Sequence, residues 1–256
     1  MSPNALRDLA VDAARHGAAA LMPYYGRPFR VTMKADGAGP VTDADLASQT
    51  AIVETLRSSG IAILAEEDGL RPDGALRRWI VDPLDGTTNF IRHLPWFCVG
   101  IALATADNVD LGVVYAPLTD ELFIAERGRG TTLNGTRQRV SDVALLSDSC
   151  LHTSCDRGMC RVPERLERFA RVASRVGELR SPNAALLDLA YVAAGRVDGF
   201  WEQGLAPWDI AAGSLLVREA GGKTSDFRGG PVQLASNEIV ASNGKIHDEL
   251  TVIVSI

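Results

Sequence analysis

Two carboxylates that follow a hydrophobic segment are the residues of this sequence best placed to do chemistry. Asp82 and Asp85 lie three residues apart after the apolar residues 79–81, with no Lys or Arg between them. Like charges held so close raise each other's pKa unless a cation lies between them. Carboxylate oxygens are the ligands that Mg²⁺ prefers, and Mg²⁺ usually keeps several of its waters. The spacing therefore predicts a divalent-metal site.

The two residues after this pair could bind an anion. Gly86 and Thr87 stand where a helix can begin, and the free N–H groups of a first helical turn bind phosphate. Metal and phosphate would then meet at one corner of the fold. Because Pro and Asp-Gly are also common in turns, a plain surface turn is the alternative.

Two more aspartates lie at the starts of predicted helices. Asp209 opens an apolar helical pattern over residues 209–220, and Asp45 follows Thr42 by three residues, as the acid of a capping box does. Each of them is either a helix cap or an exposed ligand. Glu66 follows a predicted strand at residues 61–65, and strand ends are where sites gather.

Taken in order, four elements of the sequence resemble the signatures of the inositol monophosphatase superfamily. Residues 82–89 look like its first signature and residues 208–222 like its second. Two shorter elements resemble its Gly-Glu-Glu and N-terminal motifs, at residues 65–67 and at Lys34 with residues 40–45. The order and spacing fit from about residue 34 to residue 222.

The resemblance implies two or three Mg²⁺ per subunit. Glu66, Asp82 and the backbone carbonyl of Leu84 would hold the first ion. Asp82, Asp85 and Asp209 would hold the second, and a third, weaker ion would depend on Glu66 and on water.

The resemblance also assigns catalytic roles. The amides of Gly86 and Thr87 would bind the phosphate, while Thr87 and Asp45, with a contribution from Glu66, would orient and deprotonate the attacking water. Asp209 would act where the alkoxide leaves. These roles agree with the chemistry of metal-assisted phosphoryl transfer, in which a bound metal lowers the pKa of water and the protein positions it.

Several residues are predicted to contact the substrate. Glu202 matches a family carboxylate that accepts hydrogen bonds from substrate hydroxyls, and an exposed strand-end glutamate is the alternative. Asn183 and Ala184 stand where inositol-type members usually have Gly and then Ser or Thr, which leaves the identity of the sugar open. Asp85 and Asp209 complete the predicted substrate-binding set.

The predicted activity is hydrolysis of a small sugar or polyol monophosphate resembling inositol-1-phosphate. The alternatives within the superfamily are a fructose-1,6-bisphosphatase and a histidinol-phosphate phosphatase. A non-catalytic regulatory or scaffold protein on the same fold is the alternative from another class. Relatives are commonly homodimers, so a homodimer is expected.

The elements that must position these residues fall into two groups. The first half, residues 1–140, has helical patterns followed by short strands, and it carries most of the predicted metal ligands. The second half, residues 141–256, alternates helices and strands and carries Asp209 and the specificity residues. The class is α/β to α+β, and the resemblance implies a layered αβαβα sandwich of the sugar-phosphatase type.

Composition limits the partners of the chain. Its 256 residues are 46% hydrophobic, with 32 acidic against 26 basic residues. The resulting net charge of −6 disfavours non-specific binding to nucleic acid or to an anionic membrane. No apolar stretch approaches the roughly 20 residues that span a bilayer, so a cytoplasmic protein is expected. Cys150, Cys155 and Cys160 match no standard zinc spacing and are predicted to be thiols.

Overall fold

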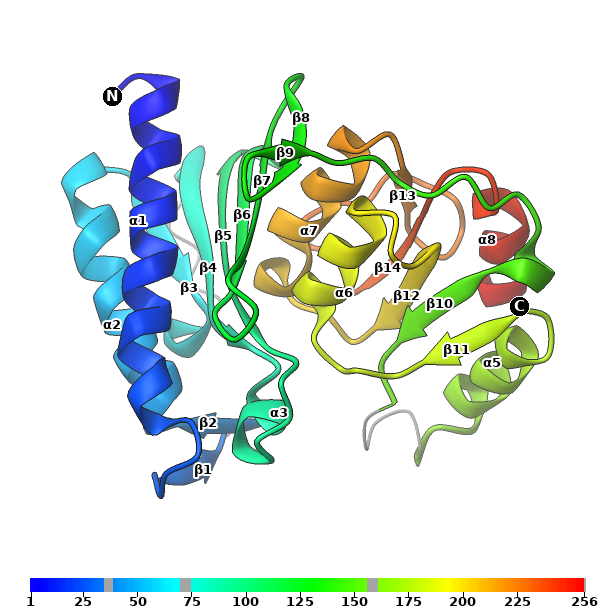
Figure 1. The fold of residues 1–256 in the computed structure, drawn as a ribbon, viewed down its shortest axis with the longest axis horizontal. Helices are drawn as coiled ribbons and strands as arrows, with labels where there is room; N and C mark the ends of the chain where they lie inside the picture. Colours follow the sequence, from blue (N-terminus) through cyan, green and yellow to red (C-terminus); the bar gives the residue numbers. More distant parts are fainter. Residues whose placement is uncertain (35–38, 70–74, 156–160, 256) are drawn as a thin grey trace.

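Helices and sheets alternate in five layers (Figure 1). The computed structural model describes residues 1–34, 39–69, 75–155 and 161–255. From the N-terminal side, the layers are α1 with α2, a seven-stranded sheet, α6 with α7, a five-stranded sheet, and α5 with α8. The predicted αβαβα sandwich is confirmed. The helices of these layers are α1 (Pro3–Leu21), α2 (Asp43–Leu56), α5 (Pro163–Ala173), α6 (Ala185–Ala193), α7 (Pro207–Glu219) and α8 (His247–Ser255).

The seven-stranded sheet follows the order of the chain. β3 pairs with β4 in parallel. From β4 to β9, each strand is antiparallel to the strand that follows it in the chain. The strands are β3 (Ala62–Ala65), β4 (Arg77–Asp85), β5 (Cys98–Thr105), β6 (Asn108–Ala116), β7 (Glu121–Glu126), β8 (Gly130–Leu133) and β9 (Thr136–Arg137). A turn at residues 127–129 joins β7 to β8. Before this sheet, β1 (Val31–Met33) and β2 (Pro40–Thr42) form a separate antiparallel pair.

The five-stranded sheet has the order β11-β10-β12-β14-β13. β10 runs parallel to both of its neighbours, whereas β14 is antiparallel to β12 and β13. Its strands are β10 (Cys150–Thr153), β11 (Glu178–Arg180), β12 (Gly199–Gln203), β13 (Lys223–Ser225) and β14 (Glu238–Ser242). The sequence predicted β12 and β14 but not the other three, which are three or four residues long and carry polar residues.

The helices of the first layer, α1 and α2, pack closely at a glycine. Ser2 caps α1 by accepting a hydrogen bond from the N–H of Ala5, and Pro3 occupies the first turn. At Gly17 an added Cβ would lie 2.6 Å from Cγ1 of Ile52 on α2. Only glycine allows the two helices to approach so closely.

The central helix layer packs against both sheets. α6 is apolar almost all round and its residues are nearly all buried, which suits a helix between two sheets. Two glycines permit the close packing. An added Cβ on Gly213 of α7 would lie 2.5 Å from Cδ1 of Leu189, and one on Gly112 of β6 would lie 2.8 Å from the carbonyl oxygen of Ala212. A boundary near residue 140 would assign the seven-stranded sheet to the first half. The five-stranded sheet and the two helices between the sheets, α6 and α7, would belong to the second half. The division into two halves stays a prediction.

Candidate active site

A distortion at the end of β4 brings two acids to one side of the strand. Residues three apart in a regular strand point to opposite faces. The pairing of β4 with β5 is regular up to Asp82 and shifts its register before Asp85, with Pro83 inside the irregularity. Proline cannot donate to the ladder and is accommodated at such bulges. The N–H of Leu84 donates instead to the Asp82 carboxylate, at 3.0 Å.

Asp85 is bound to the first turn of α6. Its carboxylate accepts hydrogen bonds from the N–H groups of Ala185 (3.2 Å) and Leu186 (2.7 Å), and the thiol of Cys98 lies 3.5 Å from it. Burial raises the pKa of Asp85 to about 7, Asp188 adds to the rise, and the amide of Leu186 opposes it. This carboxylate therefore connects the end of β4 to the central helix layer.

Glu66 and Lys34 form the neighbouring part of the cluster. Glu66 follows β3 in a single 3-10 turn, and the Nζ of Lys34 lies 2.5 Å from its Oε1 and 2.9 Å from Oε1 of Glu67. Burial raises the pKa of Glu66 to about 7, Lys34 opposes this rise, and Asp209 adds to it. The pKa of Asp82 lies well above its ordinary value because of burial first and then the negative charge of Glu66. These acids are close enough for each to disfavour ionisation of the next.

Asp209 combines the two roles that its sequence position allows. It lies in the first turn of α7, and its Oδ2 accepts a hydrogen bond of 2.7 Å from the N–H of Ala206, as a cap does. Burial raises its pKa to about 7, and Asp85 adds to this rise. The side chain therefore caps its helix and also belongs electrostatically to the acid cluster.

Thr87 and Asp45, the pair predicted to orient the attacking water, are in contact in the structure. The hydroxyl oxygen of Thr87 lies 3.0 Å from both Oδ1 of Asp45 and the carbonyl oxygen of Leu84, so it can donate to either. Asp45 is completely buried, and its other oxygen accepts hydrogen bonds from the N–H and the hydroxyl of Thr42. Burial raises the pKa of Asp45 to about 6, while the hydrogen bonds from Thr42 oppose the rise. The capping box predicted from sequence is present, and its acid, Asp45, is the residue that contacts Thr87.

Gly86 occupies a position that only glycine can fill. Its φ is 88°, and an added Cβ would lie 2.7 Å from the carbonyl oxygen of Trp96. The short helix α3 (Thr87–Ile91) begins at the next residue, as the sequence predicted. The backbone of Gly86 and Thr87 therefore turns sharply beside the acid cluster.

The predicted substrate residues lie at the end of β12 and before α6. One oxygen of the Glu202 carboxylate is buried and has no hydrogen-bond partner among the described residues. Burial raises the pKa of this group well above its ordinary value, a hydrogen bond from Ser154 opposes the rise, and Asp209 adds to it. Asn183 has a φ of 63°, a conformation that asparagine tolerates better than most residues, and Ala184 beside it is buried.

Sequence reasoning missed a buried network behind Asp85. Asp188 is fully buried in α6, with its Oδ1 2.7 Å from Nδ1 of His152 and 3.1 Å from Nε1 of Trp96. These partners are 36 and 92 residues away along the chain, so no local pattern could have revealed the contact. His152 therefore belongs to a hydrogen-bond network.

The cysteines that the structure describes are free thiols. Cys98 is buried, Cys150 is partly buried and Cys155 is exposed, while Cys160 lies outside the described residues. Cys150 is the first residue of β10, which pairs with β11 and β12 in the five-stranded sheet.

The acids fit Mg²⁺ by chemistry although they are not gathered around one point. Within the described ranges, no three His, Cys, Asp or Glu side chains form a group that could hold a metal ion as they stand. Glu66 is paired with Lys34, and Asp85 is turned to the amides of α6. Asp82 and Asp209 add further buried oxygen donors, and a dication would offset the repulsion among them. Binding would require Glu66 and Asp85 to exchange their present partners for the ion.

The arrangement of layers is that of a known protein class. The sequence profile of the inositol monophosphatase family matches residues 3–255, so the chain belongs to this family. Its members are generally magnesium-dependent phosphatases. No helix in the described part of the chain is long and apolar enough to cross a membrane.

Individual relatives carry two kinds of name. The Nus factor SuhB of Escherichia coli (strain K12) is 41% identical over 251 residues, which cover 93% of this chain and 91% of that protein. The inositol-1-monophosphatase of Mesorhizobium japonicum is 40% identical over 255 residues, or 98% and 96% of the two chains. The crystal structure of the extragenic suppressor protein suhB from Bartonella henselae superposes with a TM-score of 0.92 at 38% identity and covers 98% of both chains.

Proposed function

We propose that the protein hydrolyses a small sugar or polyol monophosphate in a magnesium-dependent reaction. The observation that carries the proposal is the cluster of the buried Asp82 and Asp85 with the partly buried Glu66 and Asp209, whose pKa values are all raised. So many acids without matching cations would be costly in a protein that did not bind a metal there. Similarity to an inositol-1-monophosphatase over almost the whole chain supports the same activity.

The residues of the cluster would hold two or three Mg²⁺. Glu66, Asp82, Asp85, Asp209 and the carbonyl of Leu84 are the proposed ligands. When bound, the metal would lower the pKa of a water molecule toward neutrality and offset negative charge on the phosphate.

The chain itself would position the reactants. The amides of Gly86 and Thr87 would donate to phosphate oxygens. The Thr87 hydroxyl would orient the attacking water, with Asp45 and Glu66 as the acids available to accept its proton. A pKa of about 6 suits Asp45 to that role because its carboxylate is largely ionised at neutral pH and still basic enough to take a proton.

The alcohol part of the substrate would lie against the second half of the chain. Glu202, Asn183 and Ala184 would contact it, and Asp209 would act where the alkoxide leaves. Buried Glu202 can accept or donate a hydrogen bond according to its protonation, which suits a ring with hydroxyl groups.

Phosphate release after chelator treatment tests this proposal. Asp82 belongs to both predicted ions, so Asp82→Asn should abolish Mg²⁺-dependent release of phosphate from inositol-1-phosphate. Its circular dichroism spectrum should stay that of the parent. Asp248→Asn removes the same charge from a surface pair with Lys223 and serves as the matched control. Near-normal turnover of Asp82→Asn would show that the metal site is misplaced.

A regulatory role is the second candidate, because several close relatives are called Nus factors. Such a role would not need the acid cluster, and the two functions can coexist in one protein. A purified protein that captures one specific partner, and does so equally well as Asp82→Asn, would support it. Homodimer formation and a cytoplasmic location also stay predictions, and light scattering on the purified protein would test the first.

A further inference from the structure

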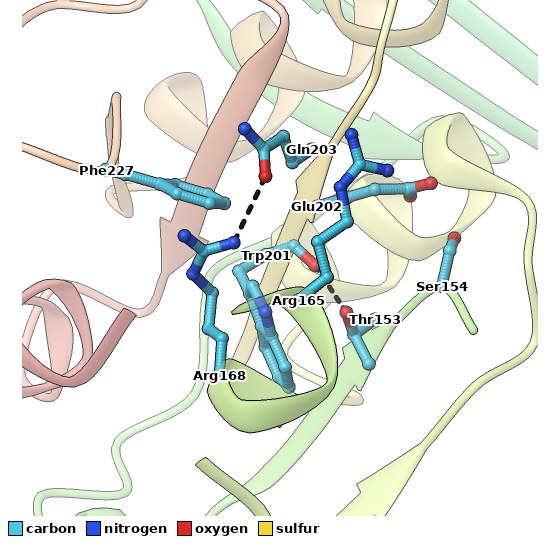
Figure 2. Close-up of a pocket in the computed structure, with 8 residues that line it drawn as sticks. All are labelled: Thr153, Ser154, Arg165, Arg168, Trp201, Glu202, Gln203 and Phe227. Carbon is cyan, nitrogen blue, oxygen red and sulfur yellow. Dashed lines mark hydrogen bonds between the residues drawn. The ribbon is translucent and has the colours of Figure 1, made fainter. Parts of the chain in front are cut away.

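A small cavity lies next to Glu202, at the ends of β10 and β12 and beneath α5 (Figure 2). Its volume is about 30 Å³, more than the roughly 10–15 Å³ that a single water needs. Its walls include Ser154, Glu202 and two arginines of α5, Arg165 and Arg168. Glu202 is near the end of β12, and a short connection leads from this strand to α7, which carries Asp209. The negative charges of Asp209 and Asp85 contribute to the raised pKa of Glu202.

Arg168 has a structural role in this wall. Its Nε donates to the carbonyl oxygen of Val254 at 2.7 Å, its Nη1 donates to Oε1 of Gln203 at 3.1 Å, and its guanidinium lies 4.8 Å from the ring centre of Phe227. These contacts fix α5 against α8 and β12. They leave Arg168 little freedom to bind anything else.

Arg165, one turn earlier on α5, is placed differently. Its side chain is half-buried, and among the described residues no carboxylate pairs with it. Its guanidinium covers Gly204, where an added Cβ would lie 3.6 Å from Nη1. Gly204 lies in the short connection between Glu202 and Asp209, so this cation is held over the segment that joins the two acids. Figure 2 shows its side chain reaching from α5 across the cavity toward β12.

We propose that Arg165 is a second anion-binding residue and that the preferred substrates are phosphate monoesters whose alcohol part carries another anionic group, either a carboxylate or a second phosphate. The inference rests on the proposed function, since it takes the reacting phosphate to lie at the acid cluster and the alcohol part to extend past Glu202. A guanidinium presents a planar fork of donors that matches carboxylate and phosphate oxygens. A neutral polyol could accept from that fork only through its hydroxyl oxygens, in weaker bonds than an anionic group would make.

Glu202 does not oppose an anion in this position. Burial raises its pKa, which favours the uncharged carboxyl group. An uncharged carboxyl can donate a hydrogen bond to an anion or to a hydroxyl group. The cavity therefore offers the Arg165 guanidinium and a carboxyl group whose ionisation is disfavoured by burial.

Two matched pairs of esters test the inference on the Mg²⁺-loaded protein. Inositol-1-phosphate is compared with inositol-1,4-bisphosphate, and glycerol-3-phosphate with 3-phosphoglycerate, so that each pair differs by one anionic group. The readout is the ratio of kcat/KM within each pair, because a ratio is unaffected by the fraction of folded enzyme. The phosphate pair and the carboxylate pair separate the two sources of the anion.

The parent protein should prefer the doubly anionic member of at least one pair by about tenfold, the lower end of what a charge-assisted hydrogen bond contributes. Arg165→Gln should remove that preference, and Arg165→Lys should restore part of it. Arg175→Gln removes the same charge from an exposed position just beyond α5 and should leave the ratio unchanged.

Four results would overturn the inference. The parent protein could release phosphate from the neutral esters without preferring either doubly anionic member, in which case the proposed function stands and the role of Arg165 falls. Equal ratios in the parent and Arg165→Gln, or the same loss in Arg175→Gln, would also refute it. Release from none of the four esters would overturn the inference and the proposed function together.

Discussion

Replacing Asp209 with asparagine should make the metal-free protein more stable while removing its activity. Asparagine has nearly the same shape, and its carbonyl oxygen can still accept the hydrogen bond from the N–H of Ala206. What disappears is a buried negative charge beside Asp85. The change therefore separates the electrostatic cost of the site from its helix-capping role.

The magnitude follows from the pKa of Asp209, which rises from 3.8 to about 7 on folding. Each pKa unit corresponds to about 1.4 kcal/mol, so the shift sets an upper limit of about 4 kcal/mol at pH 8. Because neighbouring acids share the repulsion and can take up protons themselves, we expect about 1–3 kcal/mol. For a chain of this length, that raises the unfolding temperature by roughly 2–10 °C.

The sign of the pH dependence follows from the same shift. The folded protein binds a proton at Asp209 between pH 4 and pH 7, where the unfolded chain has released it. The folded state is therefore favoured below pH 4, and this contribution is lost as the pH rises through 7. The advantage of Asp209→Asn should be largest at pH 8 and should shrink as the pH falls toward 4.

Thermal unfolding of chelator-treated protein at pH 5 and pH 8, with and without Mg²⁺, measures these effects. Mg²⁺ should stabilise the parent protein at pH 8, since it binds the folded state alone, and should stabilise the variant less. Asp248→Asn, a change at an exposed acid, should not raise the unfolding temperature. A variant that is less stable than its parent at pH 8 without metal would refute the view that the acids repel one another.

Three more changes test separate parts of the structure. Thr87→Val removes the hydroxyl that contacts Asp45 and should lower kcat about 10²–10³-fold with an unchanged unfolding temperature, whereas a loss confined to KM would argue against the water-orienting role. Glu202→Gln should change the relative kcat/KM among polyol monophosphates but not the Mg²⁺ concentration needed, and an equal loss on every ester would contradict its role in specificity. His247 is buried between two serine hydroxyls with its pKa lowered from 6.5 to about 4, so stability is lost as the pH falls from 6.5 toward 4. His247→Gln should recover up to about 3 kcal/mol of that loss, measured by urea unfolding as the difference in unfolding free energy between pH 4 and pH 7. If the unfolding free energies of the two proteins depend on pH in the same way, His247 does not titrate as inferred.

The sequence predicts most of the fold because its signals are local. Ser2 and Pro3 mark the start of α1, and the Thr42 and Asp45 pair marks α2. Segments rich in β-forming residues, separated by polar or Gly/Pro turns, mark the long strands of the first sheet. The strands that escaped prediction, such as β11, are three residues long and pair only through the tertiary fold. Their stability comes from neighbours that a local pattern does not contain.

The candidate site could be predicted in its members but not in its contacts. Acid spacing and the family resemblance single out Asp82, Asp85 and Asp209 without showing that a bulge turns the first two to one side. They also do not show that Asp85 binds amides 100 residues further along the chain. At Asn183 the sequence suggested a lost glycine, yet the left-handed backbone that a glycine would provide is retained. In each case the missing information is the tertiary environment of the residue.

The attachment of Asp85 to the first turn of α6 has a consequence for how the protein folds. Asp85 and the N–H of Ala185 are separated by 100 residues, and α6 packs against strands of both sheets. Contacts between such distant segments form late and slow the folding of a chain. The acids should therefore stay solvated through most of the folding reaction and meet only near its end. Metal affinity would then appear as a property of the completed chain, and a half-folded intermediate would have no site with which to sequester magnesium.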